Sequence, residues 1–255
     1  MDRKKILIVE DNEEVKEFLS LCLQDDFDIL LAADGAEGLH QAFEEIPDLI
    51  ITDVAMPVMD GTEFCRIVKN DPRASHIPII MLTAKVELEE QVTGIESGAD
   101  VYLTKPFSIK VLASYVNTLL RTKDQLRQYY TQKFLLAPLD VDLGNVDKLF
   151  MERLLAVIHE NIGNTDFHVN DLARKVNMST AVLYKKFNAL SQIPIAEFIK
   201  DLRLQKAASL LQESHTLNIS EIAWTVGFSD RKYFSKEFKK RFGDTPSEYA
   251  GRRSF

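Results

Sequence analysis

The chain has 255 residues, of which 45% are hydrophobic and 27% are charged, and its formal net charge is −8. These proportions are ordinary for a globular protein, and no apolar run approaches the roughly 20 residues that a membrane helix needs. Residues 1–30 contain no secretory apolar core, so the sequence predicts a cytoplasmic protein. The two cysteines, Cys22 and Cys65, are expected to be buried free thiols in a reducing compartment.

Charge is divided unevenly along the chain. Residues 1–121 carry 11 Lys and Arg against 23 Asp and Glu, a balance of −12, whereas residues 147–255 carry 17 against 13, a balance of +4. An acidic half followed by a mildly basic half indicates two domains with different partners. We predict domains at 1–121 and 147–255, joined at 122–146 by a helical extension and an irregular connector.

The first half alternates short apolar runs with longer amphipathic stretches. This alternation predicts an α/β domain with a doubly wound, five-stranded parallel sheet. The expected strands are Lys5–Val9, Asp28–Leu31, Leu49–Asp53, Ile77–Leu82 and Val101–Leu103, and the expected helices are Glu13–Leu23, Ala36–Glu44, Glu63–Asn70, Glu87–Ser97 and Ser108–Arg121.

The strand pattern ends before residue 147, and helical periodicity continues from there. Glycine and proline residues separate the periodic stretches, which predicts an all-α second domain. The expected helices cover residues 147–161, 169–176, 180–190, 195–212, 219–226 and 230–242.

Charged side chains stand at the ends of three predicted strands. Glu10 and Asp11 follow the first strand, Asp53 ends the third, and Lys105 follows the fifth. A single carboxylate after a strand is more typical of a helix N-cap or a turn. The carboxyl ends of parallel strands meet at one crevice, however, and convergent carboxylates need a cation or a shared proton. The set therefore favours a site for Mg²⁺ and a phosphoryl group, with Lys105 as a point charge and Thr83 as a hydroxyl donor.

Several strings in the first half together carry a family resemblance. In order they are Ile-Leu-Ile-Val-Glu-Asp-Asn, Ile-Ile-Thr-Asp-Val-Ala-Met-Pro-Val-Met-Asp-Gly, Met-Leu-Thr-Ala-Lys and Val-Tyr-Leu-Thr-Lys-Pro-Phe. They resemble the response-regulator receiver domain, with its CheY-like fold, over residues 3–121. The resemblance implies a phosphoacceptor at Asp53, a Mg²⁺ site of Glu10, Asp11, Asp53 and the backbone carbonyl of Ala55, phosphoryl contacts from Thr83 and Lys105, an aromatic switch at Tyr102, and a cis Lys105–Pro106 bond.

Two stretches of the second half, residues 171–190 and 221–242, each read as a short helix, a tight turn and a second helix with cations. One such pattern alone is equally typical of an ordinary helical hairpin, but two of them joined by an amphipathic helix favour paired helix-turn-helix units. Ser179 is the expected N-cap of the first recognition helix. The expected core residues are Leu183, Phe187, Phe234 and Phe238.

The stretch from Ile219 to Tyr249 is similar to the DNA-binding domain of AraC-type transcription factors, and the resemblance extends over residues 147–253. At Lys185 the family usually has arginine, and Tyr184 is bulky, so the base preferred there stays open. Lys240 and Arg241 are expected to touch phosphate at most. The resemblance implies that Ala181, Tyr184 and Lys185 face bases from the first recognition helix, and Arg231, Lys232, Ser235 and Lys236 from the second.

These features predict a phosphorylation-controlled transcription factor of a two-component system, not an enzyme. Its expected partners are DNA, a cognate histidine kinase and RNA polymerase, its cofactor is Mg²⁺, and phosphorylation is expected to promote a homodimer. The same order of domains resembles the C-terminal end of hybrid histidine kinases, although the chain has no ATP-binding or dimerisation–histidine segment. A phosphate sink whose DNA binding is vestigial is a third alternative.

Overall fold

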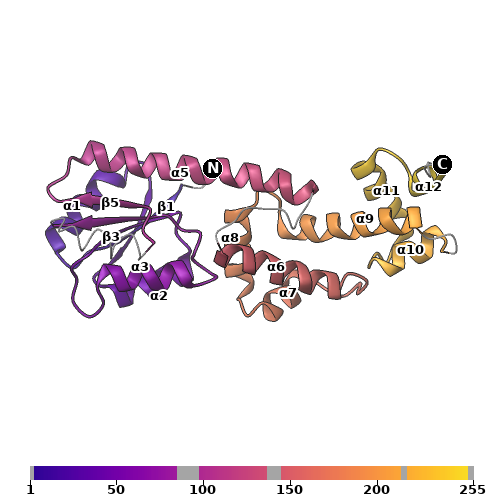
Figure 1. The fold of residues 1–255 in the computed structure, drawn as a ribbon, viewed down its shortest axis with the longest axis horizontal. Helices are drawn as coiled ribbons and strands as arrows, with labels where there is room; N and C mark the ends of the chain where they lie inside the picture. Colours follow the sequence, from indigo (N-terminus) through magenta and orange to yellow (C-terminus); the bar gives the residue numbers. More distant parts are fainter. Residues whose placement is uncertain (1–2, 85–97, 137–144, 214–216, 252–255) are drawn as a thin grey trace.

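The computed structural model describes residues 3–84, 98–136, 145–213 and 217–251. Within these ranges, a sheet domain and a helical half lie end to end along the long axis of the molecule (Figure 1). The first half contains β1 (Lys5–Val9), α1 (Glu13–Leu23), β2 (Asp28–Ala32), α2 (Gly35–Glu45), β3 (Leu49–Asp53), α3 (Gly61–Asn70), β4 (Ile79–Thr83), β5 (Val101–Thr104) and α5 (Ile109–Leu136).

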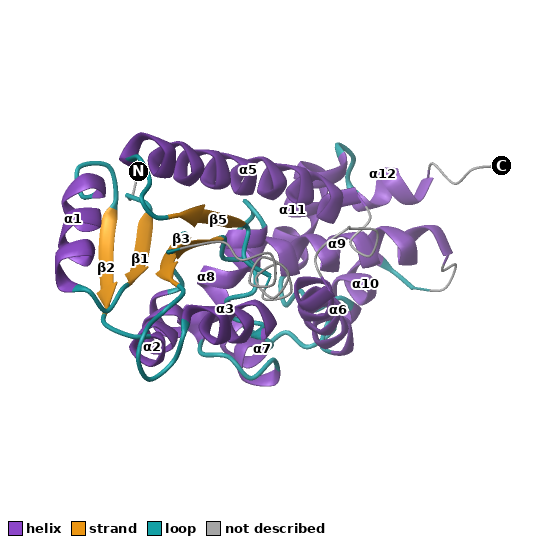
Figure 2. Cartoon of the chain, turned by 60° about the vertical axis from the view of Figure 1, so that its left-hand side comes forward, coloured by secondary structure: helices purple, strands orange, loops and turns teal. Residues whose placement is uncertain are grey.

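The sheet is parallel throughout and has the strand order β2-β1-β3-β4-β5. Both of its faces are covered, with the strands lying between α5 on one side and α2 and α3 on the other (Figure 2). Successive strand residues therefore alternate between two apolar cores. Leu7 and Ile50 pack with α2 and α3, whereas Ile6 and Ile51 pack with α1 and α5. This burial fixes the strand register that positions the polar residues at the strand ends.

The helical half is built as two small units on one long helix, α9. The N-terminal part of α9 packs with α6, α7 and α8, and its C-terminal part packs with α10 and α11 in a separate core (Figure 1). The second half contains α6 (Asn145–Glu160), α7 (Val169–Lys175), α8 (Thr180–Leu190), α9 (Ile195–Glu213), α10 (Ile219–Thr225), α11 (Arg231–Phe242) and α12 (Pro246–Gly251).

The structure confirms most predicted elements, and β1, β3, α1 and α8 begin and end at the predicted residues. It corrects β4, which begins two residues later, after Pro78, whose ring nitrogen cannot donate to a ladder. Helix α5 continues from the sheet domain through the predicted boundary at residue 121 to Leu136. The short helix α12 was not predicted, and the expected helix Glu87–Ser97 lies outside the described residues.

The cysteine expectation is half right. Cys65 is buried, but Cys22 is exposed. Helix α1 buries Leu19 and Leu23 at helical spacing, and Cys22 falls outside that stripe. Among the described helices, none combines the length and the apolarity that a membrane-spanning segment needs.

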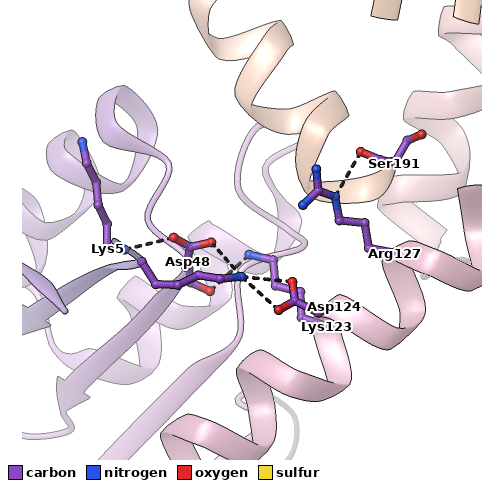
Figure 3. A network of polar contacts seen from close by, with 7 residues as sticks. Lys5, Asp48, Lys123, Asp124, Arg127 and Ser191 are labelled. Carbon is purple, nitrogen blue, oxygen red and sulfur yellow. Dashed lines mark hydrogen bonds and ion pairs between the residues drawn. The ribbon is translucent and has the colours of Figure 1, made fainter. Parts of the chain in front are cut away.

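The N-terminal end of the sheet and the extended α5 connect the two halves through polar contacts (Figure 3). Lys4 Nζ donates to Asp124 on α5 at 3.0 Å, and Lys123 Nζ donates to the carbonyl of Asp48 at 3.1 Å. Farther along α5, Arg127 Nε donates to the carbonyl of Ser191, just after α8, at 3.1 Å. The helical half thus lies at the N-terminal end of the sheet, opposite to the end that carries the predicted phosphoryl site.

Candidate functional site

The three predicted carboxylates converge at the C-terminal ends of β1 and β3, which are neighbours in the sheet. One oxygen from each of Glu10, Asp11 and Asp53 lies within 4.8 Å of the others. Glu10 is buried, Asp53 is half-buried and Asp11 is exposed, so the cluster opens to solvent on one side. This strand order places the crevice at the point where the connections diverge to opposite faces of the sheet, which is where open α/β sheets bind ligands.

Lys105, the residue directly after β5, completes the cluster. Its Nζ lies 3.0 Å from Glu10 Oε2 and 3.0 Å from Asp53 Oδ1. The backbone N–H of Lys105 donates to the carbonyl of Thr83 at 2.7 Å, which holds the residue at the end of β4. The following bond to Pro106 is cis, as predicted.

Burial and neighbouring charges shift the pKa values of Glu10 and Lys105 in this cluster. Burial raises the pKa of Glu10, the negative charge of Asp53 adds to that effect, and the hydrogen bond from Lys105 opposes it. Burial works against the charge of Lys105, but hydrogen bonds to Glu10 and Asp53 outweigh it and raise the pKa of the ammonium. The ammonium therefore stays charged and partly neutralises the carboxylates.

The donor set fits a hard divalent cation. Magnesium prefers a small number of carboxylate oxygens together with water and phosphate oxygens. An exposed Asp11 beside a half-buried Asp53 leaves room for both kinds of additional ligand. The residues present thus fit a Mg²⁺ ion.

The remaining predicted pocket residues surround this cluster. Thr83 ends β4 and is buried, and its sheet partner is Thr104. Tyr102 is half-buried on β5, pairs with Met81 and packs against the core under α2 and α3. Ala55 lies two residues beyond Asp53 and is exposed in the loop that leads to α3.

The loop after Asp53 ends at Gly61, the first residue of α3, which packs closely against the backbone of Asp53. Asp60 caps α3 by accepting a hydrogen bond from Glu63 N at 2.8 Å, and Gly61 N donates to Val54 O at 2.9 Å. A Cβ at Gly61 would lie 2.0 Å from the carbonyl oxygen of Asp53. Only glycine lets the start of α3 pack this closely against the residue at the centre of the cluster.

The first recognition helix, α8, has the predicted inward face. Ser179 caps it through a 3.2 Å hydrogen bond from Val182 N, and Leu183 and Phe187 are fully buried. Ala181 and Tyr184 are exposed. Lys185 instead bonds to the sheet domain, where its Nζ donates to the carbonyl of Glu44 at 2.9 Å and lies 3.7 Å from Glu45.

The second recognition helix, α11, is more open. Arg231, Lys232 and Lys236 are exposed, and Ser235 is half-buried. Phe234 and Phe238 are fully buried, as predicted. Of the two expected phosphate contacts, Lys240 is exposed, but Arg241 forms an ion pair with Asp201 of α9, a contact that no sequence pattern predicted.

Arg203, which the sequence analysis overlooked, ties the two helix-turn-helix units together. Its guanidinium donates to the carbonyl of Asn164 at 2.7 Å and to the carbonyl of Gly227 at 3.2 Å. Gly227 has a φ of 82°, and a Cβ there would lie 2.5 Å from the carbonyl of Ile162. These contacts fix how the turn of the second unit meets the loop that follows α6.

A second polar cluster, also absent from the sequence analysis, lies between the halves and is called the interface cluster below. Lys186 of α8 is fully buried, and its Nζ donates to Ser75 Oγ at 3.0 Å and to His76 Nδ1 at 3.0 Å. Lys186 also forms an ion pair with Asp147 of α6, which accepts from Ser75 Oγ at 2.6 Å. Because an ammonium only donates, His76 Nδ1 accepts, and burial beside Lys186 holds the pKa of His76 well below its usual value.

Two domain families match the chain. The response regulator receiver domain matches residues 6–117, and a helix-turn-helix domain matches residues 172–252. A protein named histidine kinase P4, from Formosa agariphila, is 36% identical over 253 residues, which are 99% of this chain and 18% of that protein. The DNA-binding response regulator MtrA of Mycobacterium tuberculosis is 40% identical over 123 residues, or 48% of this chain and 53% of MtrA.

Among solved structures, the signal receiver domain of a signal transduction histidine kinase from Syntrophus aciditrophicus is 39% identical. The match covers 47% of this chain and 91% of that domain, with a TM-score of 0.45. The chain spans 18% of the Formosa relative and about half of MtrA.

Proposed function

Because the chain belongs to the response regulator receiver family and carries an AraC-type helix-turn-helix domain, we propose that it is a phosphorylation-controlled, sequence-specific DNA-binding transcription factor. The observation that carries this proposal is the meeting of Glu10, Asp11, Asp53 and Lys105 at one end of the sheet, in a chain that also contains two helix-turn-helix units.

In the proposed reaction, an oxygen of Asp53 attacks the phosphorus of a phosphohistidine on a kinase. A P–O bond forms, the P–N bond breaks, and the imidazole leaves. Lys105 lies against Asp53 and neutralises charge on the incoming group, and the Thr83 hydroxyl donates to a phosphoryl oxygen. Glu10, Asp11, Asp53 and the carbonyl of Ala55 would hold Mg²⁺, which supplies further charge neutralisation when bound. Tyr102 is the proposed aromatic switch that responds to Thr83.

For DNA binding, we propose that the two recognition helices enter successive major grooves. Phosphorylation would favour a homodimer, and the bound protein would act on RNA polymerase in the cytoplasm. The proposed domains are residues 1–121 and 147–255, with α5 extending into the linker between them. The proposed base-facing residues are Ala181, Tyr184, Lys185, Arg231, Lys232, Ser235 and Lys236.

A second candidate is that these residues form the receiver and DNA-binding portion of a hybrid histidine kinase. The supporting observation is that nearly the whole chain aligns with a small part of the much longer Formosa protein. Both candidates share the same chemistry at Asp53, and the reading frame upstream of the coding sequence separates them.

The test of the proposal is phosphoryl uptake at Asp53. We expect the chain to gain the mass of one phosphoryl group from acetyl phosphate with Mg²⁺, and to gain none when Mg²⁺ is chelated. Asp53→Ala should abolish uptake, whereas Asp25→Ala, at an exposed aspartate away from the pocket, should not change it. Equal uptake by the Asp53 variant and the wild type would remove Asp53 from the proposal.

A further inference from the structure

One edge of α8 is bound to the sheet domain through two consecutive lysines. Lys185 reaches the C-terminal end of α2, and Lys186 enters the interface cluster with Ser75 and His76. Lys185 is also one of the residues proposed to face bases. The same side chain is therefore assigned to two partners, the sheet domain and DNA.

The sheet domain offers Lys185 a substitute for the acceptors of DNA. The carbonyl of Glu44 lies in the last turn of α2, where unpaired carbonyls and the helix dipole make the end negative. The carboxylate of Glu45 adds a full negative charge 3.7 Å away. In DNA the ammonium would meet guanine O6 and N7 or a phosphate, which are also acceptors. Approaching DNA phosphates would be repelled by Glu44 and Glu45.

The interface cluster makes the docked arrangement specific. Lys186 and Asp147 come from the helical half, and Ser75 and His76 come from the loop before β4. A buried ammonium is tolerated only when its hydrogen bonds are satisfied, and here the sheet domain supplies two of its three partners. Docking in another register would leave Lys186 buried without them.

The second helix-turn-helix unit is not involved in this docking. Helices α10, α11 and α12 lie at the end of the molecule farthest from the sheet (Figure 1). Helix α9, which carries both units, has 19 residues and spans roughly 28 Å at 1.5 Å per residue. The proposed base-facing cations of α11, Arg231, Lys232 and Lys236, are all exposed.

We propose that the docked receiver masks only the first helix-turn-helix unit, so that the docked chain reads DNA through α11 alone and the released chain reads it through α8 and α11. The inference rests on the proposed function and names the surface that regulates it. Lys185 cannot bond to Glu44 and to DNA at once, whereas Arg231, Lys232 and Lys236 of α11 stay exposed in the docked arrangement.

The test begins with DNA selected from a random pool by the full-length chain carrying Glu45→Lys, because only the released chain is expected to select both half-sites. Glu45→Lys places a cation opposite Lys185 and should release the helical half. Recovering one lysine contact to a base should raise affinity for the selected DNA by about 5-fold to 100-fold at constant salt. The matched control is Glu17→Lys, the same charge change on the exposed face of α1, which should leave the relative affinity for specific and random DNA unchanged.

Scrambling one half-site at a time gives the decisive comparison. The gain from Glu45→Lys should vanish when the half-site of the first unit is scrambled, and should persist when the other half-site is scrambled. A gain that is the same for both scrambled DNAs, or no gain on any DNA, would overturn the proposal.

Glu45→Lys also breaks the ion pair between Glu45 and Lys5 within the sheet domain, so a second variant that leaves this pair intact is needed. Arg127→Ala removes the contact to Ser191 and should give the same half-site dependence with a smaller gain. Arg121→Ala, at an exposed position on the same helix, should give none.

The docking itself can be measured without DNA. Spin labels on exposed Cys22 and on Lys206→Cys should report one narrow distance in the wild-type chain and a broad distribution in the Glu45 variant. If distances broaden but no sequence is selected from the pool, the proposed function fails and the docking surface stands. If sequences are selected but the distance is broad in the wild type, the masking fails and the proposed function stands.

Discussion

The two ends of the parallel sheet both carry polar side chains, but they differ in exposure and in the residues that they contact. At the C-terminal end, Glu10, Asp53 and Lys105 contact one another and leave a face open to solvent. At the N-terminal end, Asp48 and His76 contact residues of α5 and α8, so that end is covered by the linker and the helical half.

This difference separates the phosphoryl site from the docking surface. Five residues of a strand span roughly 17 Å, so a change at Asp53 cannot touch α8 directly. Any signal between them must pass through the strands or through α5, which runs from the sheet to α8. A variant at the docking surface is therefore expected to leave phosphoryl uptake at Asp53 unchanged.

The largest effect is expected at the pocket end, from Gly61→Ala. The new Cβ would lie 2.0 Å from the carbonyl oxygen of Asp53, so either the loop or the end of β3 must move. We expect at least a tenfold loss in the rate of phosphoryl uptake from acetyl phosphate and a loss of about 3 kcal/mol or more in the stability of the sheet domain.

Gly251→Ala is the matched control, because a Cβ there meets nothing within 4 Å. It should change neither the rate of phosphoryl uptake nor the stability of the sheet domain. Unchanged phosphoryl uptake by the Gly61 variant would show that the pocket does not depend on this close packing.

The pocket end was predictable because a topological rule determines it. Once Glu10, Asp11 and Asp53 were assigned to the ends of neighbouring strands, the parallel sheet left them one crevice to share. The inward faces of α8 and α11 followed in the same way from helical periodicity, and Phe187 and Phe234 are buried as that periodicity requires.

The docking end was not predictable, because its partners are distant in the sequence. Lys186 occupies an inward position of α8 near Leu183 and Leu190, and a lysine there was the one signal of a buried polar partner. Its partner His76 is 110 residues away, and no local pattern connects the two. Helix α12 was missed for another reason, since its capping box of Thr245 and Glu248 was present in the sequence but was not recognised.

A smaller effect is expected at the docking end, from Lys123→Met. The Nζ of Lys123 donates to the carbonyl of Asp48, and no carboxylate oxygen of a described residue lies within 4.0 Å of it. Burial lowers the pKa of Lys123 from 10.5 to about 8. Between these two pKa values the folded chain binds fewer protons than the unfolded chain, so the stability of the fold rises with pH in that range. The free-energy cost of burying the charged ammonium of Lys123 is therefore greatest below pH 8.

Replacing Lys123 by methionine removes that penalty, which is on the order of 3 kcal/mol at most. The variant should melt at a higher temperature than the wild type at pH 7, and the difference should shrink as pH rises toward 10.5. Lys110→Met, at an exposed position of the same helix, should show no such convergence. A difference that stays constant with pH would contradict a buried ammonium whose pKa is lowered, and phosphoryl uptake should be unchanged in either case.

The smallest effect is expected from Val58→Gly, in the loop between Asp53 and α3. Val58 is 85% exposed and has a φ of 67°, a backbone conformation that strains a β-branched residue. Glycine relieves about 1–2 kcal/mol of that strain but gives the unfolded chain more freedom, so the net gain should be about 0.5–1 kcal/mol. Urea unfolding of the sheet domain measures this gain in stability.

Val111→Gly, on α5 with ordinary helical geometry, is the control and should instead lose about 1 kcal/mol of stability. If both variants lose stability, the loop near Asp53 holds no strain, and the contrast between an open pocket end and a covered docking end would rest on the polar contacts alone.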